Sequence, residues 1–216
     1  MQRLLGLILM TKTNINILLE YLDEILPNAH CELNYKTDYE LVIAVMLSAQ
    51  TTDVSVNKVT AILFNKYPTL ISLYNATYDE IAEIIKPLGL YKNKANNIIG
   101  IVHKLVDEYQ GIVPSDKLEL QKLPGVGNKT AGVVRAEFFN IPDLPVDTHI
   151  LRISKRLNIA NKNDEPIDVE RKLKKLIPET RWIKSHHQLI HFGRYYCLAH
   201  SPKCENCKLR DFCNKN

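Results

Sequence analysis

Residues 123–131 read LPGVGNKTA and separate two stretches of helical periodicity. Pro124 cannot continue a helix, while Gly125 and Gly127 allow positive φ and a close approach of the backbone to another group. The chain can resume as a helix at about Asn128, so the stretch predicts two helices joined by a tight glycine turn. The N–H groups and the dipole at the start of the second helix favour an anion. An ordinary turn between two helices is the alternative.

Helical patterns continue on both sides of this turn. Apolar residues recur at helical spacing over residues 95–109. Thr37 with Glu40 forms a capping-box pattern, as do residues 77–80, and each precedes an apolar run. The run Leu41–Leu47 is apolar on every side, and the capping box before it favours a buried central helix over a strand. Because the sequence offers no convincing hairpin or partner strands, we predict an all-α fold.

Length and composition bound the class of protein. The chain has 216 residues, 45% hydrophobic and 24% charged, which is typical of a globular protein with one large domain or two small ones. The net charge is +4, and residues 181–216 carry seven Lys or Arg against two Asp or Glu. A polyanionic partner is therefore permitted without being required.

The chain shows no sign of a membrane partner. No stretch approaches the ~20 apolar residues that a membrane span needs. Residues 1–10 are mostly apolar with only Arg3 charged, but no small-residue cleavage site follows them, and either Met1 or Met10 can be the natural start. We expect a cytoplasmic protein.

Four of the five cysteines lie near the C-terminus, and their pattern predicts a metal centre. Cys197, Cys204, Cys207 and Cys213 follow the spacing Cys-x6-Cys-x2-Cys-x5-Cys. A disulfide framework would spread its cysteines over a small secreted chain. Four thiolates can hold either a [4Fe–4S] cluster or one zinc ion. The single Cys-x-x-Cys pair in a compact loop favours iron–sulfur, and zinc remains the alternative.

Lys129 and Asp147 are the candidate reactive groups. Lys129 falls in the first turn of the expected second helix, where the dipole disfavours its charged form, and a neutral amine is the nucleophile of imine chemistry. From the residues alone, Lys129 is only a plausible phosphate contact. Asp147 follows Pro142 and Pro145, and it can cap a helix that begins near Thr148.

Taken together, these motifs resemble the endonuclease III family of DNA glycosylases. The resemblance runs from about Ile15 to Cys213. It is carried by LSAQ at 47–50, GLY at 89–91, the glycine turn at 123–131, VDTH at 146–149, FGRY at 192–195 and the cysteine loop. Asn128 and Gly132 depart from residues common in the family, which leaves damage preference and DNA affinity in doubt but removes no catalytic group.

The resemblance implies two helical domains that flank a DNA-binding groove. A six-helix domain with the helix-hairpin-helix would span 31–141, and residues 1–30 and 142–216 would form an iron–sulfur domain. The implied activity is that of a bifunctional DNA glycosylase and AP lyase in base excision repair. Such an enzyme removes oxidised pyrimidines from duplex DNA through a lysine Schiff base and cuts 3′ to the abasic site by β-elimination. The partner would be duplex DNA with a damaged base or an abasic site, bound by a monomer at the bacterial nucleoid.

Residue roles follow from the same resemblance. Lys129 would attack C1′ of the damaged nucleotide, and Asp147 would activate it and stabilise positive charge on the sugar. Gln50 would enter the gap left by the extruded nucleotide, and Leu90 would wedge the opposite strand, with core packing as the alternative for Leu90. Phosphate contacts are expected from the hairpin and from the basic cysteine loop, which by the resemblance would hold a [4Fe–4S] cluster: Gly125, Gly127 and Thr130, then Lys203, Lys208 and Arg210.

Three other functions share parts of this pattern. A monofunctional glycosylase of the adenine-mismatch type has the hairpin, the aspartate and the cluster, but its relatives lack the lysine. A catalytically silent iron–sulfur protein would bind duplex DNA and form no imine. A zinc-binding nucleic-acid module would be colourless, without absorbance near ~400 nm.

Overall fold

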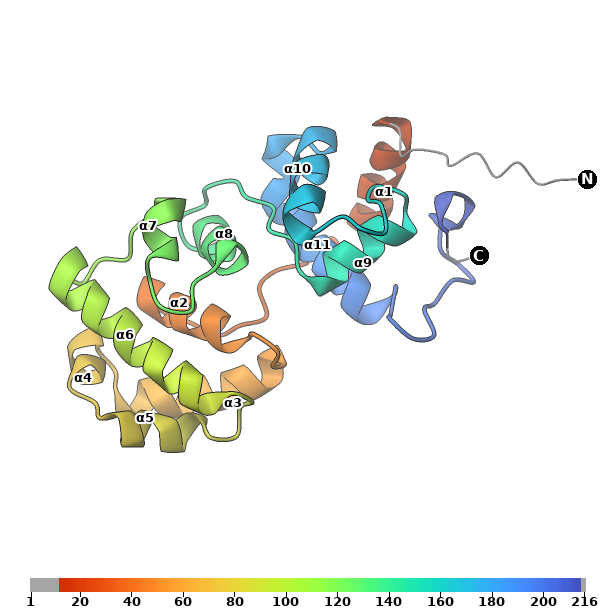
Figure 1. The fold of residues 1–216 in the computed structure, drawn as a ribbon. Coiled ribbons are helices and arrows are strands. Elements are labelled where there is room, and N and C mark those ends of the chain that lie inside the picture. The colour runs from red at the N-terminus through yellow and green to blue at the C-terminus, as the bar shows by residue number, and fades with distance from the viewer. Residues whose placement is uncertain (1–11, 215–216) are drawn as a thin grey trace, which may run out of the picture. The chain divides into compact units, whose positions relative to one another are not determined.

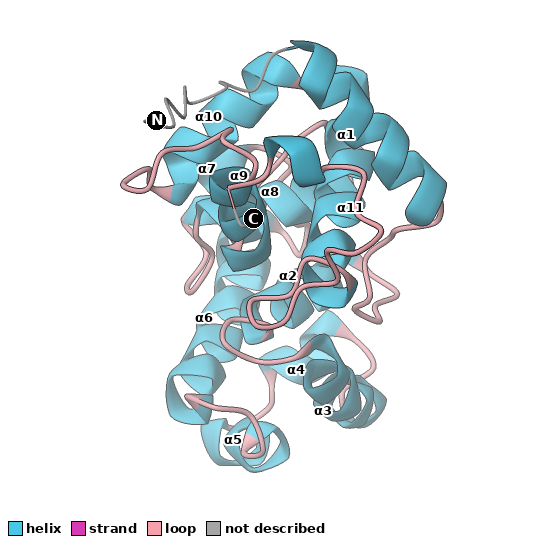
Figure 2. Cartoon of the chain, turned by 90° about the vertical axis from the view of Figure 1, so that its right-hand side faces the viewer, coloured by secondary structure: helices cyan, strands magenta, loops and turns pink. Residues whose placement is uncertain are grey.

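A computed structural model describes residues 12–214, and the chain divides into two compact units (Figure 1). We call residues 32–141 the continuous unit, and Met1–Cys31 with Pro142–Asn216 the split unit. The first boundary lies one residue later than predicted, so Cys31 belongs to the split unit. Throughout residues 12–214 the regular elements are helices and no strand is present (Figure 2), which confirms the all-α prediction. Met1 and Met10 lie outside the described residues.

The continuous unit contains seven helices, where the family resemblance implied six. The additional helix is the five-residue α4, a single turn capped by Thr69 with Ser72 that is too short for apolar periodicity to reveal. The helices are α2 Asp38–Leu47, α3 Asp53–Lys66, α4 Leu70–Tyr74, α5 Tyr78–Ile85, α6 Tyr91–Tyr109, α7 Lys117–Gln121 and α8 Asn128–Glu137.

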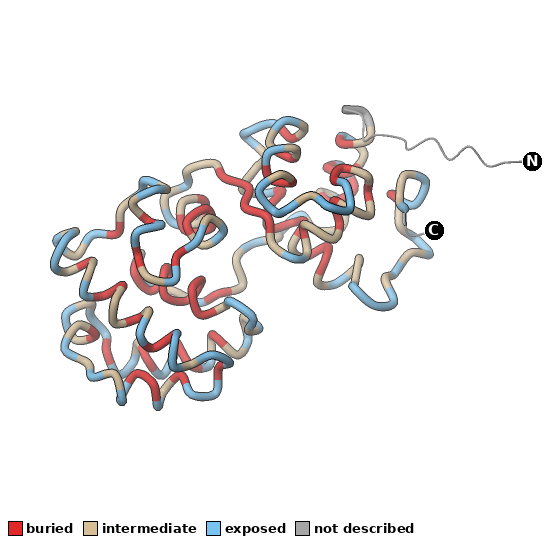
Figure 3. The backbone as a smooth tube through the Cα atoms, in the orientation of Figure 1, coloured by how far each residue is buried: buried red, intermediate tan, exposed pale blue. Residues whose placement is uncertain are grey.

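Helix α2 is the core of the continuous unit. Every residue from Tyr39 to Leu47 is buried, so the helix runs red in Figure 3, and it contacts α3, α6 and α8. The expected central helix is therefore confirmed. Its cap differs from the expected box, because the Thr37 hydroxyl accepts from Glu40 N–H while the Glu40 carboxylate accepts from Lys36 N–H at 2.5 Å. The side chain of Glu40 thus reaches one residue further back than the usual box.

The split unit is built around a second apolar core. Its helices are α1 Lys12–Ile25, α9 Thr148–Arg156, α10 Pro166–Leu176, α11 Trp182–Tyr195 and the short 3₁₀ turns η1 Glu179–Arg181 and η2 Arg210–Phe212. Helix α11 packs against both α1 and α9, and α10 packs against α9. Leu18 and Leu22 of α1, Ile150 and Ile153 of α9 and Phe192 of α11 meet in the core. Within the described part of the chain, no helix is both long and apolar enough to cross a membrane.

Candidate functional site

The glycine turn has the predicted form. Gly125 has φ +75, a conformation that favours glycine, and a Cβ there would collide with the side-chain amide of Asn97. Helix α8 begins at Asn128, as predicted, and its N-cap Gly127 makes no side-chain hydrogen bond to the first turn. A Cβ at Gly127 would meet nothing within 4 Å, so the backbone is open to close approach there. This geometry suits an anion at the start of the helix.

Lys129 and Thr130 lie in the first turn of α8, directly after this opening. Lys129 is exposed, whereas Thr130 is partly buried. The apolar residues that follow, Ala131 to Val134, are buried and fix the helix against the core of the continuous unit. The exposed lysine thus lies in the helical turn whose free N–H groups favour an anion.

Gln50 and Leu90 share an unusual backbone conformation. Gln50 has φ 55 and Leu90 has φ 60, in the left-handed region that non-glycine residues rarely adopt. Both are exposed, and Leu90 keeps 60% of its surface accessible. Core packing, the alternative for Leu90, is therefore wrong. Strained residues of this kind gather at functional sites, where the surrounding structure holds them in place.

Asp147 occupies the N-cap of α9, as predicted, and its Oδ1 accepts a hydrogen bond from Ile150 N–H at 2.8 Å. It belongs to the split unit, whereas Lys129 belongs to the continuous unit. The carboxylate is partly buried, and the chain before it, from Asp143 to Val146, is buried throughout. Helix α9 therefore begins on a segment that is fixed before the cap.

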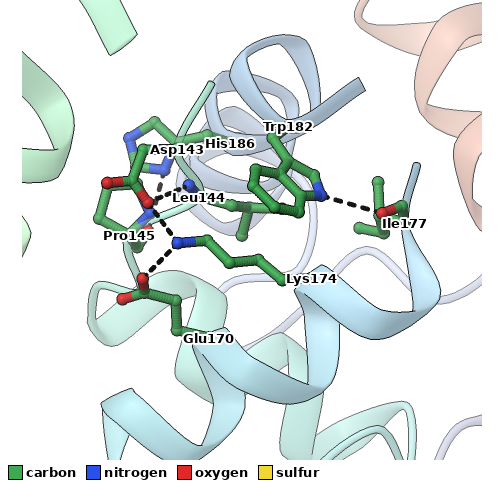
Figure 4. Close-up of polar contacts among 8 residues, drawn as sticks. All are labelled: Asp143, Leu144, Pro145, Glu170, Lys174, Ile177, Trp182 and His186. Carbon is green, nitrogen blue, oxygen red and sulfur yellow. Dashed lines mark hydrogen bonds and ion pairs between the residues drawn. The ribbon is translucent and has the colours of Figure 1, made fainter. Parts of the chain in front are cut away.

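A buried ionic network fixes that segment (Figure 4). The Lys174 ammonium lies 2.5 Å from Asp143 Oδ1 and 2.6 Å from Glu170 Oε1, and the two acids are 1% and 5% exposed. His186 Nδ1 lies 3.0 Å from the Pro145 carbonyl oxygen. Burial alone would lower the pKa of Lys174, but hydrogen bonds to Asp143 and Glu170 raise it above its ordinary value. Ionic contacts thus hold in place the chain segment that leads to Asp147.

The four C-terminal cysteines line a single pocket. Successive backbone turns shape the loop, since Cys207 N–H donates to the Cys204 carbonyl at 3.3 Å and Cys213 N–H donates to the Arg210 carbonyl at 3.1 Å. Burial raises the pKa of the Cys207 thiol, and the neighbouring thiols raise it further. Among residues 12–214, no three His, Cys, Asp or Glu side chains form a group that could hold a metal ion.

Two arginines of α9 tie the cysteine loop to the helices. Arg156 donates to the Cys197 thiol sulfur at 3.1 Å and to the Leu198 carbonyl at 2.7 Å. Arg152 donates to the carbonyls of Gly193 and Cys197, at 2.8 and 3.0 Å. Guanidinium donors fixed on a helix compensate the negative charge that thiolates bring to such a loop.

The basic residues of the loop are all exposed: Lys203, Lys208 and Arg210. Lys208 lies 2.5 Å from Glu24 of α1, and the Lys203 ammonium lies 5.6 Å from the centre of the Tyr196 ring. These contacts hold the two lysines near the body of the split unit while leaving their charges accessible to water and to a polyanion.

Some functional contacts were missed by sequence reasoning. Arg156 reaches a thiol 41 positions later, and Lys174 reaches an acid 31 positions earlier, so no local pattern links them. Lys94 was missed although a signal existed, because a lysine four positions after Leu90 faces the same side of the helix as that residue. Its amine donates to Thr51 Oγ1, next to Gln50.

A model of the HhH-GPD superfamily of base excision DNA repair proteins matches residues 43–179, more than half of the chain. The chain belongs to this superfamily. The match includes the glycine turn, the first turn of α8 and the cap of α9. The cysteine loop lies beyond it.

Relatives of this HhH-GPD protein narrow the assignment. It is 44% identical to endonuclease III of Bacillus subtilis over 93% of its own chain and 92% of that protein. It is 44% identical to endonuclease III of Escherichia coli K12 over 87% of its chain and 88% of that protein. The HhH-GPD chain is accordingly a base excision repair enzyme, a DNA glycosylase with AP lyase activity.

Solved structures agree with this HhH-GPD assignment. A trapped endonuclease III–DNA covalent intermediate superposes with a TM-score of 0.92 at 46% identity and covers 94% of this chain and 96% of its own. A thermostable thymine-DNA glycosylase superposes with a TM-score of 0.84 at 22% identity, over 95% and 97% of the two chains. That second likeness supports the fold alone.

Proposed function

We propose that this enzyme removes oxidised pyrimidines from duplex DNA through an imine formed by Lys129, and then cuts the strand by β-elimination. The observation that carries the proposal is the position of Lys129. Its amine is exposed in the first turn of α8, immediately after a backbone opening at Gly127 that suits a DNA phosphate. A phosphate bound to the N–H groups of that turn would bring the damaged sugar within reach of the amine.

In the proposed reaction, the neutral Lys129 amine attacks C1′ of the damaged nucleotide. A bond forms between Nζ and C1′, and the bond from C1′ to the base breaks, so that the base leaves with the electron pair and takes up a proton. Opening of the sugar gives the imine. Loss of a C2′ proton then breaks the C3′–O3′ bond, and water hydrolyses the imine to release Lys129.

Asp147 is proposed to act on the sugar while it caps α9. Its Oδ1 accepts from Ile150 N–H, which fixes the carboxylate, and its other oxygen can face the substrate. A fixed carboxylate stabilises the positive charge that develops on the sugar as the base departs, and it can take a proton from the attacking amine. The ionic network at Lys174 supports this role because it fixes the chain leading to Asp147.

Gln50 and Leu90 are proposed to refill the base stack when the damaged nucleotide leaves it. An enzyme that acts on a base inside a duplex must extrude it, at a cost of a few kcal/mol. Both residues project from left-handed turns and are exposed, which is the state that a side chain inserting into DNA requires. Phosphate contacts are proposed for Gly125, Gly127 and Thr130, and for the exposed basic side chains Lys203, Lys208 and Arg210.

The cysteine loop is proposed to hold a [4Fe–4S] cluster. The four cysteines line one pocket, and Arg156 donates to one of the sulfurs, which supports the proposal, although the thiols as placed do not form a metal-binding group. When bound, the cluster would supply structural cross-linking of the loop through its thiolates. The chain's own residues, Lys203, Lys208 and Arg210, would then be presented to phosphates in a fixed arrangement. We expect a monomer that acts on the bacterial chromosome.

Borohydride trapping tests the central proposal. Wild type, Lys129→Ala and Lys122→Ala are incubated with a duplex that carries one oxidised pyrimidine. We expect a covalent protein–DNA band in wild type and in Lys122→Ala, which removes another exposed lysine shortly before the turn. Lys129→Ala should lose the band, because no amine remains to form the imine.

Other outcomes assign other functions. Base release without a trapped band in wild type would identify a monofunctional glycosylase and remove the role of Lys129. Binding to duplex DNA without base release or trapping on any lesion would favour the catalytically silent protein. For the metal centre, purified protein with absorbance near ~400 nm supports the cluster, and a colourless protein containing one zinc contradicts it.

A further inference from the structure

Lys94 is a buried lysine to which the proposed reaction gives no role. It lies on α6, one turn after Leu90, and is 4% exposed. Its backbone N–H donates to the Leu90 carbonyl at 3.1 Å, which closes the first turn of the helix. Its ammonium donates to Thr51 Oγ1 at 2.7 Å. Lys94 therefore joins the turn that carries Leu90 to the loop that carries Gln50.

This contact is costly for stability. Burial lowers the pKa of Lys94, which shows that its surroundings disfavour the charge. Its partner is the neutral hydroxyl of Thr51, and a hydrogen bond to a hydroxyl offsets less of the cost of burying the charge than an ion pair with a carboxylate would. An apolar side chain of similar volume would satisfy the core at least as well. The Lys94 ammonium therefore matters more for the position of Thr51 than for the free energy of folding.

The same face of α6 also packs against the glycine turn. Asn97 lies one turn beyond Lys94, and its amide packs beside Gly125 and 3.9 Å from the Met46 sulfur. Gly100 follows, and a Cβ there would lie 2.8 Å from Pro124 Cγ. Residues at this spacing share one side of a helix. One rigid helix therefore contacts all three loops of the continuous unit that carry proposed DNA contacts.

We propose that Lys94 is a positioning residue that fixes the distance between Gln50 and Leu90, so that both can enter the base stack together. The proposal rests on the stack-refilling roles given above and adds the element that couples them. Two strained loops on separate segments hold their spacing only if something rigid connects them. The link from Thr51 through Lys94 to the first turn of α6 is such a connection.

The test uses two substrates that differ in the need for base extrusion. The first is a duplex with one oxidised pyrimidine, and the second is a single strand with one abasic site, which requires no extrusion. Single-turnover rates are measured on both for wild type, Lys94→Met, Thr51→Val and Thr51→Ser. Lys104→Met is the matched control, because Lys104 lies on the same helix and pairs with Glu108. A 2-aminopurine beside the lesion reports unstacking by its fluorescence.

We expect Lys94→Met and Thr51→Val to lower the rate on the duplex by about tenfold or more, since misplacing the side chains forfeits part of the few kcal/mol needed for extrusion. The same variants should lose the 2-aminopurine signal and yet cleave the single strand within about twofold of the wild-type rate. Thr51→Ser keeps the hydroxyl and should behave as wild type. The urea midpoint of Lys94→Met should not fall, because an apolar residue suits the buried position.

Two results would overturn the proposal. Equal losses on both substrates would mean that Lys94 supports the fold in general, and an unchanged rate on the duplex would mean that the link has no role in extrusion. Failure of the proposed function shows in the wild-type enzyme itself, which then either acts on neither substrate or releases the base from the duplex without cleaving the single strand. The two failures are therefore distinguishable in one set of measurements.

Discussion

The two units place their proposed DNA-facing residues by different physical means. In the continuous unit, Gln50, Leu90 and Gly125 project from positive-φ turns around the fully buried helix α2. In the split unit, charged side chains hold the corresponding segments in place. Lys174 pairs with Asp143 in the chain before Asp147, and Arg156 donates a hydrogen bond to the cysteine loop. An apolar core can support strained turns, whereas a loop without its own core needs ionic contacts with buried backbone and side chains.

This difference predicts different responses to substitution. Strain in a turn can be relieved by one residue that tolerates the conformation, so stability and activity can move in opposite directions. A buried ionic network cannot be relieved by removing one member, because the remaining charges stay buried.

Lys174→Met should destabilise the split unit strongly. The change removes the ammonium that lies between the buried carboxylates of Asp143 and Glu170, and breaking such a network typically costs about 3–5 kcal/mol. Urea unfolding followed by circular dichroism measures the loss. Native-state hydrogen exchange should locate it in α9 and α10 while α2 keeps its protection.

Lys175→Met is the matched control, since Lys175 is the neighbouring lysine and is exposed. Its unfolding free energy should change little. Adding Asp143→Asn and Glu170→Gln to Lys174→Met should recover part of the loss, because the uncompensated charges are then gone. If the two methionine variants unfold at the same urea concentration, the network does not hold this unit together.

Local chemistry explains what could be predicted from the sequence. Residues 41–47 are apolar on every side, so a buried helix was predictable, and Pro124 with Gly125 fixed the position of the turn and the start of α8. Asp147 was predictable as a cap because Thr148 opens a helical pattern after two prolines. In each case the residues that determine the structure are neighbours in the chain.

What escaped prediction depends on contacts between distant residues or on strain. Gln50 and Leu90 adopt positive φ although neither is glycine or asparagine, so their residue types give no signal of it. The partners of Arg156 and Lys174 lie far along the chain and become neighbours only when the split unit folds. The short helix α4 depends on the cap formed by Thr69 and Ser72 rather than on periodicity.

Leu90→Gly tests the strained turn of the continuous unit. Relief of the left-handed conformation should leave the unfolding free energy unchanged or raise it by up to about 1 kcal/mol, since little buried surface is lost. Excision from duplex DNA should fall because the wedging side chain is gone. Differential urea unfolding and single-turnover excision measure the two effects separately.

Leu118→Gly supplies the contrast. Leu118 is 70% exposed, but it lies within the regular helix α7, where glycine costs about 1 kcal/mol. We therefore expect a loss of stability in this variant, opposite in sign to Leu90→Gly, with excision unaffected. A similar loss of stability in both variants would show that the Leu90 turn stores no strain.

Asp23→Asn should have the smallest effect, and one that depends on pH. Burial alone would raise the pKa of Asp23, but hydrogen bonds from Lys184, Gln188 and Arg181 lower it to about 2. A lowered carboxyl pKa contributes stability above its unfolded value and loses it as pH falls through the folded value. Near neutral pH, the unfolding free energy of wild type should exceed that of Asp23→Asn by at most about 1 kcal/mol, because the carboxylate is 35% exposed and screened by solvent.

The difference in unfolding free energy between wild type and Asp23→Asn should shrink below the ordinary aspartate pKa of 3.8 and vanish toward about 2, as Asp23 itself becomes neutral. Urea midpoints across that range measure it, and added salt should reduce it because the ion pairs are partly exposed. Glu20→Gln, on the exposed side of the same helix, is the matched control. If the difference in unfolding free energy between wild type and Asp23→Asn persists at low pH, the effect comes from the shape of the side chain and not from its charge. Charged contacts would then contribute less to the stability of the split unit than the Lys174 network implies.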